Sequence, residues 1–191
     1  VISAQTGLVS NVLGTRRSIQ EFYEEEYALH EESADSQIAF YSDGGPQGIA
    51  GAIVDFVLEG YSGNGNLNVL DVGCGKGLML REISERLDSP LLTGIEPSRR
   101  ARERIAADAK LQGVQISTLD EVVSGGYQYD LVLLNGVLEH VADPNLFIKE
   151  SAELLDDDGL MFIVFPNHYY WWFWNFPYYI IRKILRLKID T

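Results

Sequence analysis

The residues of this chain best suited to chemistry are a carboxylate and the glycines that follow it. Asp71 ends a short apolar run, and Gly73, Gly75 and Gly77 come after it at alternate positions. Glycine lets a ligand lie against bare backbone, and the exposed N–H groups at the start of a following helix attract anionic groups. The pattern therefore predicts a strand, a ligand-binding turn and a helix.

The spacing of these glycines distinguishes between kinds of ligand. A Walker phosphate loop needs glycine at position 70 and serine or threonine at position 77, where the chain has Leu70 and Gly77. A dinucleotide fingerprint needs its third glycine at the position of Leu78. The pattern therefore disfavours NAD and FAD, and a carboxylate ahead of the loop suits a cationic ligand better than a pyrophosphate.

Strand and helix patterns alternate from residue 67 onward, which predicts right-handed crossovers and a parallel sheet. The predicted strands cover residues 67–72, 91–95, 114–118, 130–134 and 160–165. Helices are predicted near 77–87, 98–110 and 144–155, with a short turn or helix after Asp120 and a tight exposed turn at 156–159. Ligands bind beyond the carboxyl ends of such strands, so the residues that end the strands are candidates for a site.

Two helices are predicted before the sheet. Residues 16–32 form an amphipathic pattern with Tyr23 and Tyr27 on its apolar face. The second helix follows a turn at 43–46, and its predicted apolar face consists of Ile49, Ala52, Ile53, Phe56 and Val57.

Composition limits the class of function. The chain has 191 residues, 46% of them hydrophobic, which is enough for one domain with a small N-terminal appendage. A net charge of −13 argues against nucleic acid, whose phosphates need a basic face. The single cysteine, Cys74, permits no internal disulfide, and we interpret it as a small side chain that fits the glycine turn. Nothing resembles a signal peptide, so a reducing cytoplasm is expected.

The segment Val-Leu-Asp-Val-Gly-Cys-Gly-Lys-Gly at 69–77 resembles the first motif of the Rossmann-like S-adenosylmethionine-dependent methyltransferases. Segments 129–132, 137–144, 154–160 and 166–167 look like the fourth strand of that family, its following loop and the fifth strand. The resemblance implies an α/β fold with a doubly wound, mostly parallel sheet and helices on both faces. It divides the chain into a helical cap (1–45), a cofactor-binding core (46–167) and an extension (168–191).

The resemblance also implies S-adenosyl-L-methionine as the cofactor. A carboxylate at Glu96 can accept hydrogen bonds from both ribose hydroxyls, although an acid beside Pro97 also suits a helix start. Asp120 is the candidate for the adenine amino group, and Asn135 for the border of the methionine portion. The N-terminal helix would close over the cofactor, unless its tyrosines belong to the core. The implied binding set is Asp71, Gly73, Cys74, Gly75, Gly77, Glu96, Asp120 and Asn135.

His140 is the candidate catalytic base, because an unperturbed imidazole titrates near neutrality and can take a proton from the methyl acceptor. The alternative is that residues 138–141 form a structural half-turn beside the cofactor loop. Some catechol-type relatives of the family use a Glu-x-x-Glu-His constellation for metal, but Gly136 stands where the first glutamate would fall, so no metal is expected. Asp130 begins a strand and is expected to be structural.

The expected function is therefore an S-adenosylmethionine-dependent methyltransferase (EC 2.1.1 type) that acts on a small-molecule, sugar or lipid-linked acceptor. Two alternatives stay open at this point. One is a non-catalytic nucleoside-binding module, and the other is a nucleotide-dependent oxidoreductase or epimerase.

The segment after residue 167 departs from the family pattern, because the antiparallel hairpin expected there is not recognisable. Aromatic residues at 169–179 lead instead into a basic amphipathic stretch that ends at 188, and the uncharged part is shorter than the roughly 20 residues that span a bilayer. We expect 168–188 to be largely helical and to border the acceptor entrance, as a lid, a homodimer contact or a surface-lying membrane anchor. Alternatively, the chain is truncated and its continuation would cover these aromatics.

Overall fold

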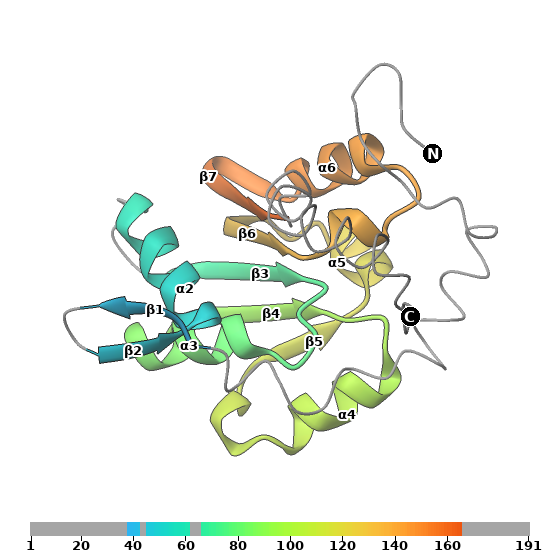
Figure 1. Ribbon diagram of the computed structural model, residues 1–191. Helices are drawn as coiled ribbons and strands as arrows, with labels where there is room; N and C mark the ends of the chain where they lie inside the picture. Colours follow the sequence, from blue (N-terminus) through green and yellow to red (C-terminus); the bar gives the residue numbers. More distant parts are fainter. Residues whose placement is uncertain (1–37, 43–44, 62–65, 166–191) are drawn as a thin grey trace, which may run out of the picture.

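The computed structural model describes residues 38–42, 45–61 and 66–165. Its main sheet has five parallel strands in the order β5-β4-β3-β6-β7 (Figure 1). The strands are β3 (Asn68–Val72), β4 (Leu91–Ile95), β5 (Gln115–Ser117), β6 (Tyr129–Asn135) and β7 (Leu155–Val164). The chain runs outward from β3 to β5 and then returns to the other side of β3, so the strand order reverses between β3 and β6. The predicted α/β fold with a parallel sheet is confirmed.

Helices connect the strands, and side-chain caps fix where several of them begin. Ser98 accepts a hydrogen bond from the Ala101 N–H, and Asp143 caps the helix that starts at Pro144. The helices after β3 are α3 (Leu78–Arg86), α4 (Arg99–Ala107), α5 (Leu119–Gly125) and α6 (Pro144–Ala152), with 3₁₀ turns η2 (Ala109–Leu111) and η3 (Leu138–His140). These positions agree with the predicted helices to within a few residues.

The two central strands are buried on both faces of the sheet. Val69 of β3 and Leu131 of β6 pack on one face against residues of the preceding helix α2 (Ile49–Gly60), α3 and α4. Leu70 packs on the opposite face, with Val122 of α5 and Leu154 after α6. Because both faces are covered, these strands are nearly continuous apolar runs, as central parallel strands usually are.

The predicted apolar face of α2 is wrong in part. Ile49 and Phe56 are 40% and 64% exposed, whereas Val54 and Val57 are buried. Two adjacent faces of a helix can satisfy the same apolar spacing, and contact with α3 and the sheet selects the one that contains Val54. The ring of Phe56 instead lies 5.7 Å from that of Phe162 on β7, measured between ring centroids.

An antiparallel hairpin of β1 (Ile38–Ser42) and β2 (Gly45–Gly48) precedes α2. The boundary predicted at residue 45 falls within this hairpin. Tyr23, Tyr27 and the segment 168–188 lie outside the described residues. Among the residues that are described, no helix is both long and apolar enough to cross a membrane.

Residues 156–159 form a bulge inside β7 rather than a turn ahead of it. Tyr129 of β6 pairs with Leu155, but Leu131 pairs with Leu160, so the residues between them protrude. The aspartates in the bulge are exposed, as predicted. Gly159 is needed there, because a Cβ would lie 2.8 Å from the carbonyl oxygen of Tyr129.

Candidate functional site

Parallel pairing brings the predicted site residues to one edge of the sheet. Val72 at the end of β3 pairs with Ile95 of β4 on one side and with Leu134 of β6 on the other. The glycine loop at 73–77, Glu96 and Asn135 therefore leave the sheet side by side, where the strand order reverses. Figure 1 shows β3 and β4 ending on this same side. This is the edge at which open α/β sheets bind ligands.

The three glycines of the loop have different roles, although all three have positive φ angles. A Cβ on Gly73 would lie 2.8 Å from Cγ2 of Val137, and a Cβ on Gly77 would lie 2.8 Å from Cδ1 of Leu111. Both glycines are therefore needed for close packing as well as for backbone conformation. Above Gly75, in contrast, nothing lies within 4 Å of the Cβ position, so this glycine presents bare backbone to open space.

Glu96 ties the glycine loop to the start of α4. One carboxylate oxygen accepts a hydrogen bond from the Gly75 N–H at 2.8 Å, and the other accepts one from the Ser98 N–H at 2.7 Å. The guanidinium of Arg102 donates to the Glu96 carbonyl oxygen at 2.7 Å. Burial raises the pKa of Glu96, while the two backbone N–H groups and Arg102 act in the opposite direction. Each carboxylate oxygen keeps a second lone-pair direction for a ligand hydroxyl.

Asp71 is the most unusual polar residue of the site. Its side chain is only 2% exposed, and Oδ2 has no hydrogen-bond partner. Burial first, and the nearby Glu96 carboxylate second, raise the pKa of Asp71 to about 7. A buried carboxylate without a partner is costly, and a cation placed at this edge would relieve the cost. The two carboxylates, which accept hydrogen bonds, and the bare backbone at Gly75 therefore fit a ligand that carries hydroxyls and a positive charge.

Cys74 packs inward from the loop rather than toward a ligand. Its sulfur lies 2.7 Å from the Cβ position of Gly94 on β4, so Gly94 leaves room for the thiol. Burial, together with the charges of Asp71 and Glu96, raises the pKa of the thiol far above its usual range. This arrangement agrees with the interpretation of Cys74 as a small packing residue.

Asp120 and its neighbour Glu121 differ in what they do at the start of α5. Glu121 forms a capping box with Thr118, and one of its oxygens also accepts a hydrogen bond from the Ser117 hydroxyl at 2.9 Å. Asp120 is exposed. The sequence Thr-Leu-Asp-Glu at 118–121 carries the capping-box signature, which is the local signal for this role of Glu121.

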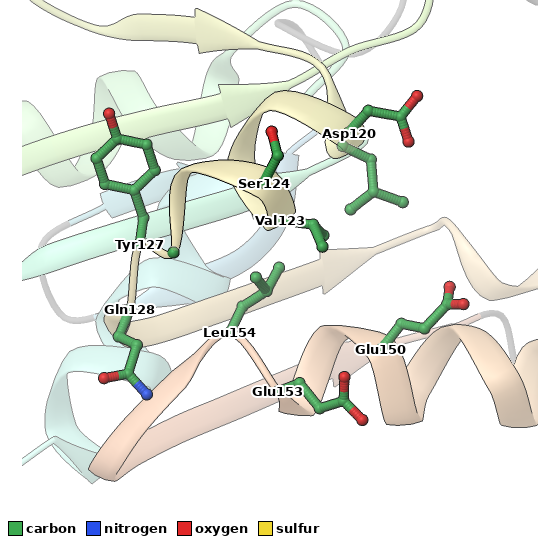
Figure 2. Close-up of a pocket in the computed structure, with 10 residues that line it drawn as sticks. Asp120, Val123, Ser124, Tyr127, Gln128, Glu150, Glu153 and Leu154 are labelled. Carbon is green, nitrogen blue, oxygen red and sulfur yellow. The ribbon is translucent and has the colours of Figure 1, made fainter.

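Asp120 also borders a pocket of about 610 Å³ between α5 and α6. Figure 2 shows Asp120 on α5, Glu150 on α6, and Glu153 directly after α6. The lining residues are Leu119, Asp120, Val123, Ser124, Gly126, Tyr127, Gln128, Glu150, Glu153 and Leu154. None of them belongs to the glycine loop, so this pocket is separate from the cluster of Asp71 and Glu96.

The loop after β6 brings His140 to the same edge of the sheet. Asn135 ends β6 and is half-buried, and Val137 contacts the glycine loop at Gly73. His140 follows in η3, where its backbone N–H donates to the Val137 carbonyl oxygen at 2.9 Å, and the residue is exposed. The half-turn predicted for 138–141 is therefore present, and it holds His140 in an exposed position three residues after Val137.

Asp130 lies at the opposite edge. Its Oδ2 accepts a hydrogen bond from the Asn68 N–H at 2.8 Å, which links the starts of β6 and β3. The structural role predicted for this residue is confirmed.

Comparison with known proteins places these features in a family. Residues 30–185 match the family model of a methyltransferase domain. A ubiquinone biosynthesis O-methyltransferase of Bartonella tribocorum is 33% identical over 125 residues, which cover 63% of this chain and 49% of the relative. The enzyme of the same name from Caulobacter vibrioides is 38% identical over 106 residues, which cover 53% of this chain and 41% of the relative. The chain thus spans about half the length of the curated relatives it matches.

Solved structures share the fold. The plantazolicin methyltransferase BpumL, in complex with a pentazolic desmethylPZN analogue and SAH, superposes with a TM-score of 0.53 at 22% identity, covering 62% of this chain and 46% of that one. Coclaurine N-methyltransferase gives a TM-score of 0.51 at 24% identity, and the match covers 59% of this chain and 34% of that one.

Proposed function

Because this chain belongs to the methyltransferase domain family that its residues 30–185 match, we propose that it transfers a methyl group from S-adenosyl-L-methionine to a small-molecule, sugar or lipid-linked acceptor. The observation that carries the proposal is the carboxyl edge of the sheet. There a bare glycine backbone, an anchored carboxylate and a buried, unpartnered carboxylate lie together at Gly75, Glu96 and Asp71.

The residues at this edge suit different parts of the cofactor. The Glu96 carboxylate would accept the ribose hydroxyls, and Gly75 would let the nucleoside lie against the backbone. Asp120, exposed after β5, would reach the adenine amino group. Asp71 and Asn135, on β3 and β6, would face the charged amino acid portion. The strand order β5-β4-β3-β6 supports this sequence of contacts along the edge.

Methyl transfer needs an aligned acceptor and a way to remove its proton. When bound, the cofactor supplies a methyl group activated by a sulfonium. We assign His140 as the base that takes the proton from an oxygen or nitrogen acceptor, because it is exposed and follows Val137, which contacts the glycine loop, by three residues. No metal is assigned to the reaction.

The proposed acceptor is a small molecule rather than a nucleic acid. Support comes from the acidic charge of the chain and from relatives named as ubiquinone biosynthesis O-methyltransferases. We further propose a cytoplasmic location, with 168–188 bordering the acceptor entrance as a lid, a homodimer contact or a peripheral membrane contact. Co-sedimentation with anionic liposomes at low salt tests the membrane role, and its absence would remove that role.

Calorimetric titration with S-adenosylhomocysteine tests the proposed function. We expect saturable binding of one ligand per chain, and no heat of binding with NAD at the same concentration. Binding of NAD in preference to S-adenosylhomocysteine would support an oxidoreductase instead. Cofactor binding with no transfer to any small-molecule acceptor would support a non-catalytic module.

A further inference from the structure

Two buried carboxylates lie close together at the candidate site, and only one of them is fully hydrogen-bonded. Glu96 is 6% exposed, and both of its oxygens accept backbone N–H groups. Asp71 is 2% exposed, and its Oδ2 has no partner. Two ionised carboxylates in such a place repel each other, so one of them is favoured to hold a proton.

The charged groups around Asp71 explain which carboxylate keeps the proton. Arg102 reaches the backbone carbonyl of Glu96 from α4 and favours the ionised form of Glu96. In the glycine loop the thiol of Cys74 is buried and neutral, and Lys76 is not among the charges that shift the pKa of Asp71. Burial and the Glu96 charge raise the pKa of Asp71 to about 7. Asp71 is therefore the member of the pair that stays neutral below neutral pH.

We propose that Asp71 carries a proton in the cofactor-free protein and releases it to solvent when the ammonium group of the cofactor binds beside it. The O–H bond of the carboxyl breaks, the proton leaves to the buffer, and the carboxylate pairs with the ammonium. This inference rests on the proposed function. It adds to that function a coupling between cofactor binding and proton release. Through this coupling Asp71 distinguishes ligands that carry an ammonium group from ligands that do not.

The order of the strands indicates which part of the cofactor Asp71 senses. Asp71 lies on β3, between Glu96 after β4 and Asn135 at the end of β6. Glu96 is assigned to the uncharged ribose, which cannot stabilise a second carboxylate. The amino acid portion lies on the Asn135 side, and its ammonium is a cation that can.

Calorimetry in buffers of different ionisation enthalpy measures the released protons directly. With S-adenosylhomocysteine at about pH 6, where Asp71 still holds its proton, we expect release of nearly one proton per ligand bound. Asp71→Asn should bind the same ligand with a release near zero. 5′-Methylthioadenosine, which has neither ammonium nor sulfonium, should bind the native protein without proton release.

The pH dependence of affinity gives a second measure. The affinity of the native protein for S-adenosylhomocysteine should rise by up to about tenfold per pH unit between pH 5 and 6.5, because the proton must be displaced at lower pH. Asp71→Asn should show a flat profile over the same range. The histidines of the chain are unchanged in this variant, so a slope that persists in it would assign the proton elsewhere and overturn the proposal.

An infrared measurement on the native protein keeps the test independent of the variant's folding. A protonated-carboxyl band should be present without ligand and disappear when S-adenosylhomocysteine is added. Binding without proton release and without loss of this band would overturn the coupling alone. Absence of any binding would overturn the proposed function as well.

Discussion

Asp71 and Asp130 lie on neighbouring strands, at opposite ends of the sheet, and their surroundings are opposite too. Asp130 is half-buried, and its Oδ2 accepts the Asn68 N–H at 2.8 Å. Asp71 is almost fully buried, and its Oδ2 has no partner. At the amino edge an aspartate closes a hydrogen-bond network of the fold. At the carboxyl edge an aspartate is left in need of a partner, which a ligand can supply.

This comparison separates residues that hold the sheet together from residues that hold a ligand. If it is correct, removing a side chain that contacts ligand at the carboxyl edge should lower cofactor binding or turnover, and neutralising the unpartnered Asp71 should raise stability. Removing Asp130 at the amino edge should lower stability and leave cofactor binding unchanged.

The largest effect is expected at Glu96. Glu96→Ala removes the carboxylate that is assigned to two ribose hydroxyls, and charge-assisted hydrogen bonds contribute about 1.5–3 kcal/mol each, so the affinity for S-adenosylhomocysteine should fall by about 10³-fold. Glu103→Ala is the matched control, because it removes an exposed carboxylate from α4. Unchanged affinity in Glu96→Ala would place this residue with Asp130, among those that serve only the fold.

The next largest effect is expected at His140. His140→Ala should lower turnover by about 10²-fold while cofactor affinity stays near the native value, because the imidazole is assigned to the acceptor's proton. His140 is exposed, so the unfolding temperature should change little. Turnover equal to that of the native protein would leave η3 with a structural role alone. Activity should also survive treatment with EDTA. Full loss of activity in EDTA would show that the reaction needs a metal, contrary to our assignment.

Asp71→Asn should stabilise the cofactor-free protein, and increasingly so as the pH rises. The pKa of Asp71 rises from 3.8 in the unfolded chain to about 7 in the fold, so the folded state binds more protons in this range. Native stability therefore falls as the pH increases through it. Between about pH 5 and pH 8, the difference in the free energy of unfolding between the variant and the native protein should grow by about 2–3 kcal/mol. Urea unfolding at the two pH values measures this, and a constant difference would contradict it.

The smallest effect is expected at the amino edge. Asp130→Ala leaves the Asn68 N–H without its partner and should lower the free energy of unfolding by about 1–2 kcal/mol, with cofactor affinity unchanged. Asp130→Asn keeps an acceptor oxygen and should therefore lower the free energy of unfolding by less than Asp130→Ala does. A large loss of affinity in Asp130→Ala would remove the distinction between the two edges.

Much of the framework follows from local sequence. The strand at 91–95 is predicted at its observed bounds, because a short apolar run between polar segments is typical of a buried parallel strand. The glycine loop was also recognisable, since Asp71 and the alternating glycines are contiguous in the chain. Parallel topology then places Glu96 and Asn135 at the same edge.

What the sequence did not reveal depends on contacts between distant segments. Gly73 and Gly75 are equivalent in the motif, and only the positions of Val137 and the open space above Gly75 distinguish them. The orientation of α2 likewise depends on which neighbour covers it, so Phe56 was assigned to the wrong face. The missing partner of Asp71 Oδ2 is a property of the whole cluster, which no local pattern encodes.

The bulge in β7 has a consequence for how copies of this protein behave at high concentration. The outer strands of the described sheet are β5, which is three residues long, and β7, whose bulge presents three exposed aspartates. Short edge strands and charged bulges oppose the pairing of one sheet edge with another, which is a common route to aggregation. The three aspartates, to which we assign no part in catalysis, would thus keep the sheet from extending into a second molecule.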